Sequence, residues 1–458
     1  MSESAAKSMS RREFLRNTGR MAAASALAGV AIPHVHAAED NTIQVALVGC
    51  GGRGTGAAVN AMEVPNGHAK LVAMADVFED RLNSSHNSLK ERPAEQFDVP
   101  EDRKFAGFDA YKKAMDCLRP GDVAIFATPP AFRWVNFAYA IKKGLNVFME
   151  KPVTVDGPST RKLFQLADES VKKNLKVGVG LMSRHSRALQ ELAKRVHDGE
   201  IGDIILQRGY RMHGPIGFFA SPPKPEGISH LRYQVRRFHS FIWASGGNYS
   251  DFYIHIIDHQ GWMKNAWPVK AQALGGRHYR GDSVDQNFDV YAVEYTYADG
   301  TTFLFDGRCM TGCQNIYSSY LHGAKGMAIA SKEGDCGMPS STYKGQNPVR
   351  SDMIWESKVN PDEDNPYQNE WNDLIDAIRK DKPYNEAKRG AEASMVSSMG
   401  RMAAHTGQII TWDDILNCEH EMAPGLDNLT EDSPAPLLPL PDGKYPVPQP
   451  GIVKNREY

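Results

Sequence analysis

Two side chains with acid–base chemistry stand close together in the second half of the chain. Asp251 and His255 are four residues apart in a segment that begins after Gly246-Gly247. If this segment is a helix, that spacing places both side chains on one face. A carboxylate beside an imidazole fixes the ring tautomer and raises its basicity, so the pair is a candidate general base. The alternatives are a capped helix with a core histidine and a metal cluster that also includes His259.

Lys151 is the third candidate for chemistry. It follows Glu150 and the short apolar segment 146–149, and it precedes Pro152. A lysine ammonium placed near a reacting oxygen polarises it and eases the loss of hydride from the attached carbon. A solvated lysine in a surface loop is the alternative interpretation.

A glycine-rich turn near the start of the chain predicts a dinucleotide site. Gly49-Cys50-Gly51-Gly52-Arg53-Gly54 directly follows the apolar segment 43–48 and precedes residues 55–62, which have helical character. Gly49 would make the tight turn, Gly51 would let the backbone approach a pyrophosphate, and Gly54 would let the helix pack on the strand. Asp76, 22 residues after Gly54, would accept hydrogen bonds from the adenosine ribose. Its charge favours NAD over NADP, whereas Arg53 keeps NADP as an alternative.

The elements that must position these residues alternate between strand and helix in the first half. Apolar segments that end at residues 75, 127, 149 and 179 predict strands, and 132–143 and 156–172 predict helices. Repeated βα units indicate a doubly wound parallel sheet, which we assign to a Rossmann domain over residues 41–180. Ligands bind at the carboxyl ends of such strands. Thr128, Pro129 and Lys151 are therefore expected at the cofactor crevice.

The pattern changes after about residue 180. Strands are expected at 201–211, 269–274, 288–297, 301–305 and 323–330. Asp299-Gly300 between two of them is typical of a hairpin turn. Residues 181–420 are therefore predicted to form an α+β domain with an open, mostly antiparallel sheet, which can offer one face to a partner.

The two ends of the chain have their own composition. Arg11-Arg12 precedes the apolar segment 21–32, which is too short to span a bilayer. Small residues three positions and one position before the cut are typical of a cleavage site after Ala37. Residues 1–37 are thus predicted to be a twin-arginine signal peptide of a periplasmic or otherwise exported protein, with a disordered basic terminus as the alternative. Residues 423–458 contain eight prolines and predict an extended arm or a loose tail.

Composition excludes collagen-like, coiled-coil, disordered and multi-span membrane proteins. The net charge is −2, hydrophobic residues make up 41% and charged residues 24%, which is ordinary for globular domains. The charge gives no cationic surface for nucleic acid. No segment is apolar enough for a membrane span. The six cysteines lack the paired spacing of a zinc site, so no metal is expected.

Taken together, these motifs resemble the Gfo/Idh/MocA family, which includes glucose–fructose oxidoreductase and inositol dehydrogenase. The resemblance covers roughly residues 41–418 and rests on the following motifs: the glycine turn, Asp76, Thr128-Pro129, Glu150-Lys151-Pro152, Arg184, Gly246-Gly247, Asp251, His255, Asp258, Gly323-Ala324-Lys325-Gly326 and residues 370–378. It implies that Lys151, Asp251 and His255 are the catalytic residues.

The resemblance also implies an NAD(P)-dependent oxidoreductase that exchanges hydride with a sugar or polyol. The nicotinamide cofactor would be tightly bound, as in exported relatives, and the C-terminal sheet would form a homo-oligomer interface. Gly49, Gly51, Gly52, Arg53, Gly54, Asp76, Thr128, Pro129, Glu150 and Lys151 are predicted to contact the cofactor. Arg184, Tyr249 and Arg236 are predicted to contact the substrate.

The chain departs from the family pattern at three places. Arg133 stands where relatives often have a histidine, and Tyr249 and Ser250 stand where relatives often have aliphatic residues. The insert 212–243, which contains Arg232, Arg236, Arg237 and His239, is atypical. The insert is predicted to be either a set of cationic substrate contacts or a surface loop. Two other functions remain: a glycosidase that oxidises its substrate transiently with NAD, and a non-catalytic NAD-binding protein.

Overall fold

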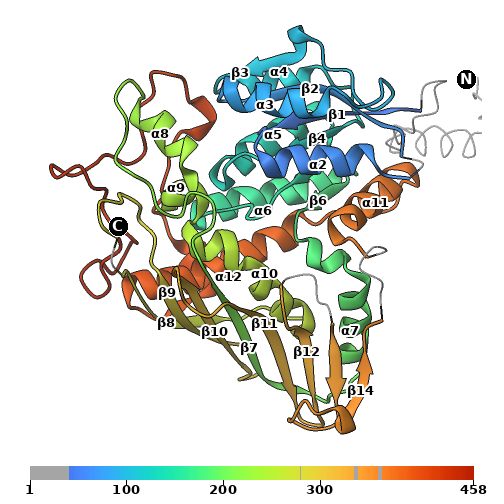
Figure 1. Cartoon of the computed structure of the whole chain (residues 1–458), viewed down its shortest axis with the longest axis vertical. Coiled ribbons are helices and arrows are strands. Elements are labelled where there is room, and N and C mark those ends of the chain that lie inside the picture. Colours follow the sequence, from blue (N-terminus) through green and yellow to red (C-terminus); the bar gives the residue numbers. More distant parts are fainter. Residues whose placement is uncertain (1–40, 66, 279, 335–338, 359–363) are drawn as a thin grey trace, which may run out of the picture. The chain divides into compact units, whose positions relative to one another are not determined.

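The computed structural model describes residues 41–458 except 66, 279, 335–338 and 359–363, and it arranges these residues around two β-sheets (Figure 1). The predicted signal peptide, residues 1–37, lies outside the described residues. Within the described part, no helix combines the length and the hydrophobicity that crossing a bilayer requires.

The first sheet is the predicted doubly wound parallel sheet. Its strand order is β3-β2-β1-β4-β5-β6, and every pairing is parallel. The strands are β1 (Ile43–Val48), β2 (Ala69–Asp76), β3 (Lys104–Ala106), β4 (Val123–Phe126), β5 (Asn146–Met149) and β6 (Val177–Val179). The helices of this half are α2 (Gly52–Met62), α3 (Glu79–Leu89), α4 (Ala110–Asp116), α5 (Arg133–Lys143) and α6 (Gly157–Lys172). The two central strands, β1 and β4, are apolar except for Gln44 because both faces of the sheet are buried.

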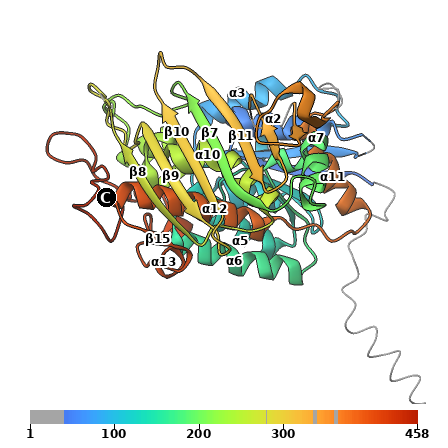
Figure 2. The same ribbon diagram turned by 90° about the horizontal axis from the view of Figure 1, so that it is seen from below.

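The second sheet is the predicted open, mostly antiparallel sheet. Its order is β14-β13-β12-β11-β7-β10-β9-β8-β15, with one parallel pairing, β7 with β10. The strands are β7 (Ile204–His213), β8 (Lys270–Gly276), β9 (Val290–Thr296), β10 (Thr302–Cys309), β11 (Ile316–Gly323), β12 (Met327–Ser331), β13 (Ser341–Tyr343), β14 (Met353–Glu356) and β15 (Ile410–Thr411). Helices α10 (Gly247–Lys264) and α12 (Ala387–Thr406) pack on one face, and Figure 2 shows the other face toward the viewer.

One predicted strand was wrong. Residues 323–330 were expected to be a single strand, but β11 ends at Gly323 and β12 begins only at Met327. The intervening Ala324-Lys325-Gly326 is the turn of a hairpin. A Cβ at Gly326 would lie 2.1 Å from the carbonyl oxygen of Tyr343, so the close approach of the neighbouring chain requires glycine there.

A helix that follows strand β14 of the second sheet in sequence packs against the first sheet. The remaining helices are α7 (Arg187–His197), α8 (His230–Arg236), α9 (Ile242–Ser245), α11 (Pro366–Arg379) and α13 (Trp412–Asn417). From α11, Trp371 lies against Phe148 of β5 with ring centroids 4.5 Å apart, and Leu374 joins the same core cluster. The predicted second domain therefore contributes a helix to the packing of the first sheet.

The proline-rich arm packs against the insert. Leu426, Leu437 and Tyr445 of the arm belong to the same apolar cluster as Phe241 and Trp243. The hydroxyl of Tyr445 also lies 2.9 Å from the Nδ1 atom of His230. Since the arm buries these side chains, its 423–458 segment has a defined course over the insert.

Candidate functional site

The turn between β1 and α2 forms an open cradle. Gly49 has a φ of +96°, and a Cβ there would lie 2.5 Å from the carbonyl carbon of Ala127. A Cβ at Gly54 would lie 2.0 Å from the carbonyl oxygen of Gly49, so α2 packs this closely only without a side chain. By contrast, a Cβ at Gly51 or Gly52 would meet nothing described within 4 Å. The open space at the helix N-terminus fits a pyrophosphate, as the sequence predicts.

A cavity of about 480 Å³ lies in front of this cradle. This volume is in the range of small-molecule and cofactor pockets. The glycine turn, Asp76, Thr128 and Pro129 line it, as do six residues from the insert and the arm: Phe218, Val235, Phe238, His239, Leu426 and Leu429. The insert, for which a surface loop was one interpretation, therefore forms part of the cavity wall together with the arm.

Asp76 lies at the end of β2 and is held by the backbone. Its carboxylate accepts hydrogen bonds from the N–H of Cys50 at 2.7 Å and of Phe78 at 2.9 Å. Burial raises the pKa of Asp76, and these two hydrogen bonds act in the opposite direction. The carboxylate is therefore fixed at the edge of the cavity, where a ribose would be recognised.

Arg53 and Glu150 connect the glycine turn to the end of β5. The Nε atom of Arg53 lies 2.7 Å from Oε1 of Glu150, and its guanidinium lies 4.7 Å from the centre of the Tyr367 ring. Burial, followed by the charge of Glu150, raises the pKa of nearby Glu370 well above its usual value. Arg53 lines the cavity, whereas Glu150 is buried behind it and is not among the described lining residues.

Arg133, the position that departs from the family pattern, holds two strand ends together. It donates hydrogen bonds to the carbonyl oxygen of Glu150 at 2.8 Å and to Oγ1 of Thr128 at 2.8 Å. Burial lowers its pKa to about 10. Because it ties the end of β4 to the end of β5, Arg133 fixes the residue immediately before Lys151. No pattern in the sequence indicated this role.

Lys151 and Asp251, 100 residues apart in the chain, are in contact. The Nζ atom of Lys151 donates to the backbone oxygen of Asp251 at 2.6 Å and lies 3.4 Å from its Oδ1 atom. Asp251 is 6% exposed. Neither residue is among the described residues that line the cavity, but Asp251 lies next to one that does, His239.

His239 is the residue that sequence reasoning left without a specific role. Its Nε2 atom lies 3.3 Å from Oδ2 of Asp251, so the carboxylate lies between a lysine and an imidazole. Burial, and after it the charges of neighbouring cations, lowers the pKa of His239, whereas Asp251 acts in the opposite direction. An atypical histidine in an insert was the only signal in the sequence.

The remaining residues predicted on α10 differ in their surroundings. His255 lies one turn after Asp251 and is 8% exposed. Tyr249 is 0% exposed, and its hydroxyl is 2.8 Å from that of Tyr295 in the core above the second sheet. The prediction that Tyr249 contacts substrate is wrong in this structure, because the helix directs that side chain to the sheet.

The two predicted substrate arginines are both in ion pairs. Arg184 donates to both carboxylate oxygens of Asp258 at 2.8–3.0 Å, and its guanidinium lies 5.2 Å from the Trp262 ring centre. Arg236 donates to both oxygens of Asp80 at 2.7 and 2.9 Å. Arg236 therefore joins the insert to the nucleotide half, which is a structural position rather than the predicted contact with substrate.

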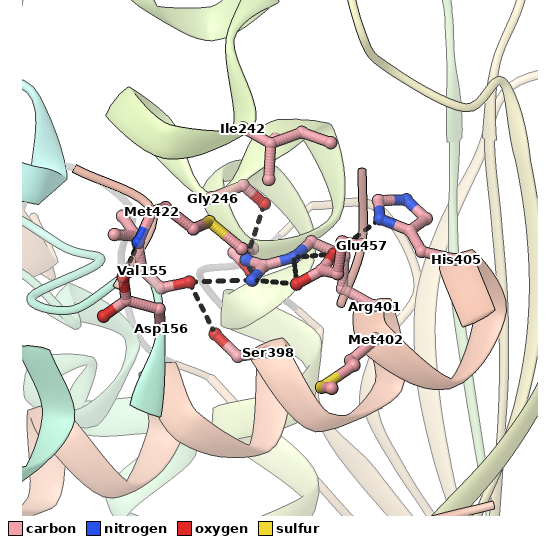
Figure 3. A network of polar contacts seen from close by, with 12 residues as sticks. Val155, Asp156, Ile242, Gly246, Ser398, Arg401, Met402, His405, Met422 and Glu457 are labelled. Carbon is pink, nitrogen blue, oxygen red and sulfur yellow. Dashed lines mark hydrogen bonds and ion pairs between the residues drawn. The ribbon is translucent and has the colours of Figure 1, made fainter. Parts of the chain in front are cut away.

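A second carboxylate cluster fixes the segments that carry the candidate catalytic groups (Figure 3). Glu457 accepts hydrogen bonds from Arg401 and lies 2.6 Å from Nδ1 of His405. Arg401 also donates to the backbone oxygen of Val155 at 2.7 Å and of Gly246 at 2.9 Å. The end of the chain is thereby connected to the loop after Lys151 and to the start of α10.

No group of three or more histidine, cysteine, aspartate or glutamate side chains is placed to hold a metal ion within the described residues. His259, the third member of the alternative cluster, lies 3.2 Å from Oγ of Ser319.

Part of the chain is similar to a curated enzyme. Over 144 residues, the chain is 25% identical to inositol 2-dehydrogenase of Corynebacterium glutamicum strain R, a match that covers 31% of this chain and 42% of the relative. The chain thus matches less than half the length of this curated relative.

Solved structures share the fold at low identity. Aldose-aldose oxidoreductase from Caulobacter crescentus, complexed with glycerol, has a TM-score of 0.61 at 16% identity, covering 81% of this chain and 99% of that one. Scyllo-inositol dehydrogenase from Lactobacillus casei with bound NAD(H) and scyllo-inositol has a TM-score of 0.58 at 22% identity, with the same coverage.

The sequence from the first strand to the end of α7 also matches a family described as "oxidoreductase family, NAD-binding Rossmann fold". Residues 43–195 are therefore similar to the NAD-binding Rossmann fold of the Gfo/Idh/MocA oxidoreductases.

Proposed function

We propose that this protein is an NAD(P)-dependent oxidoreductase that transfers hydride between a sugar or polyol hydroxyl or carbonyl group and a tightly held nicotinamide cofactor. The observation that carries the proposal is the contact of Lys151 with Asp251 beside the cofactor cavity. Two charged groups brought together from distant parts of the chain next to a dinucleotide cradle are typical of an active site. The inositol dehydrogenases among the similar proteins support the substrate class.

The residues act on the hydroxyl group of the substrate. Lys151 would bind the substrate oxygen through its ammonium and stabilise the negative charge that develops there. His255 would take the hydroxyl proton, and Asp251 would keep the ammonium of Lys151 in position. A nicotinamide cofactor, when bound, supplies the acceptor for the hydride. Gly51, Gly52 and Asp76 would hold its pyrophosphate and ribose.

NAD is the cofactor we favour, with NADP as the alternative. The fixed carboxylate of Asp76 at the cavity edge favours a ribose with free hydroxyls over a 2′-phosphate. Arg81 also lines the cavity and would offset part of that repulsion. Mass spectrometry of the nucleotide released from the native protein distinguishes the two.

The experiment that tests the function is a panel of sugars and polyols read at the nicotinamide absorbance band. We expect at least one compound to reduce the bound cofactor. In Lys151→Met we expect the rate to fall by about 100-fold or more, the cost of removing one transition-state donor. Lys162→Met, which removes a partly exposed lysine paired with Glu421, is the matched control and should keep full activity.

Two outcomes would contradict the proposal. Native protein that neither contains nor binds a nicotinamide nucleotide would remove its basis. Hydrolysis of a chromogenic glycoside without net cofactor reduction would favour the transient-oxidation glycosidase instead.

We further propose export through a twin-arginine signal and self-association through the open face of the second sheet. Leu274 of β8 is 77% exposed, and Val290 and Leu304 on β9 and β10 are each 40% exposed. The strand pairings place these three side chains on one face. Such an apolar face is typical of an interface between subunits. Cell fractionation and light scattering test the two proposals.

A further inference from the structure

The insert 212–243 presents one histidine to the proposed catalytic carboxylate. His239 lies on the cavity wall, and its Nε2 atom is 3.3 Å from Oδ2 of Asp251. Lys151 lies 3.4 Å from the other oxygen, Oδ1. Asp251 therefore has one oxygen toward an ammonium from the nucleotide half and one toward an imidazole from the insert.

The contacts of His239 determine which ring nitrogen carries the proton. The backbone N–H of Phe218 donates a hydrogen bond to its Nδ1 atom at 3.1 Å. Because a backbone N–H can only donate, Nδ1 must hold a lone pair. In the neutral ring the proton is then on Nε2, which is the atom that faces Asp251.

Two aromatic side chains lie close to the His239 ring. The Phe238 ring lies 3.9 Å from the His239 ring between centroids, and the Phe252 ring lies 5.5 Å away with an interplanar angle of 20°. Phe252 is the neighbour of Asp251 on α10, so the histidine and its carboxylate are positioned by adjoining residues. A side chain restrained in this way is suited to orienting another group.

We propose that His239 is a positioning residue for Asp251: its neutral imidazole donates from Nε2 to Oδ2 and leaves Oδ1 to Lys151. This inference rests on the proposed function for the role of Asp251. Both nitrogens of His239 are used, one by Phe218 and one by Asp251, so it acts through the carboxylate rather than as the base itself.

The inference also links the cofactor to the acid–base groups. Phe218 and Phe238, which hold the ring, line the same cavity as the glycine turn. A cofactor that fills this cavity would pack against both phenylalanines and restrain the histidine on Asp251. The long contact of 3.3 Å is expected to shorten when the cavity is filled, as catalytic hydrogen bonds often do.

The first test needs no substrate. In protein labelled with ¹⁵N-histidine, the His239 signal, assigned by its loss in His239→Gln, should show the neutral Nε2–H tautomer at pH 7. Burial, the cations Lys151, Arg81 and Arg237, and Asp251 all act on this ring. Asp251 favours the charged form, so Asp251→Asn should move the His239 titration to lower pH. An Nδ1–H tautomer, or a titration that Asp251→Asn leaves unchanged, would overturn the proposal.

The second test compares two substitutions in the active enzyme. His239→Gln can place an amide N–H where Nε2 is, whereas His239→Phe keeps the ring stacking and removes the donor. We expect kcat to fall by about 10-fold or more in His239→Phe, with the acid limb of the pH profile moved to higher pH, and we expect His239→Gln to recover most of both.

Equal losses in the two variants, without a change in the acid limb, would show a purely structural role and overturn the inference. The two proposals fail separately. If no sugar is oxidised but the tautomer and the titration shift are as expected, the contact stands and the proposed function falls. If sugars are oxidised and the tautomer is the other one, only this inference falls.

Discussion

Asp251 and Glu457 have the same kinds of neighbour and very different surroundings. Each carboxylate lies between a cation and an imidazole: Lys151 and His239 for Asp251, Arg401 and His405 for Glu457. Around Glu457 the contacts are 2.6–3.2 Å. Around Asp251 the two side-chain contacts are 3.3 and 3.4 Å, and one neighbour lines the cavity.

The difference separates a structural ion pair from a candidate active site. The Arg401 cation and its hydrogen-bond partners enclose Glu457 and hold its pKa at about 2 in spite of burial. Asp251 is held less tightly and lies beside space that a ligand can fill. Residue type alone does not distinguish the two clusters, whereas contact length and access to a cavity do.

The largest expected effect is on stability at the Glu457 cluster. Glu457→Gln would leave the Arg401 cation buried without its counter-charge, and we expect the free energy of unfolding to fall by about 3–5 kcal/mol. Urea denaturation measures this. Glu421→Gln, which removes the carboxylate of a partly exposed ion pair with Lys162, is the control and should cost less than about 1 kcal/mol. Equal losses in both variants would remove the distinction between the clusters.

At Asp251 we expect the opposite balance between activity and stability. Asp251→Asn should lower the rate of sugar oxidation by about 100-fold, as for loss of a group that supports acid–base catalysis. The free energy of unfolding should change by no more than about 1 kcal/mol, because Lys151 keeps its bond to the backbone oxygen of residue 251. A large loss of stability with normal activity per folded molecule would reverse our assignment.

A third imidazole, that of His185, extends the comparison to the pH dependence of stability. His185 lies between Asp373 at 2.7 Å and Glu386 at 3.3 Å. Although burial opposes the charged form, these carboxylates raise its pKa to about 8. For His405, burial outweighs the effect of Glu457 and lowers the pKa.

The signs of the two effects differ. The contribution of His185, about 2 kcal/mol for this shift, should be fully present below its unfolded pKa of about 6.5 and lost as pH rises through about 8. The contribution of His405 should be present above that unfolded value and lost as pH falls below it. Urea unfolding of the wild type and His185→Gln between pH 6 and 9 measures the first effect. Parallel curves for the two proteins over that range would exclude it.

The insert and the arm show what the sequence could not predict. Nothing in the spacing of Phe218, His239 or Leu429 indicates that they line one cavity with the glycine turn. They meet there because the chain returns from positions at least 90 residues away in sequence to the ends of β1, β2 and β4. The sequence also could not predict where the Tyr249 side chain points, because α10 is buried on nearly all sides and its sequence has no single apolar stripe.

The sequence by itself determined the parts that depend on local chemistry. The parallel strands, the glycine turn that permits close approach, and the acid at the end of β2 follow from apolar runs, steric limits and short spacings. Only the tertiary structure decided which cation and which imidazole each carboxylate meets. Three of the four pairings of Asp251 and Glu457 join residues 52 to 100 positions apart. They depend on how helices and strands pack, which no local pattern encodes.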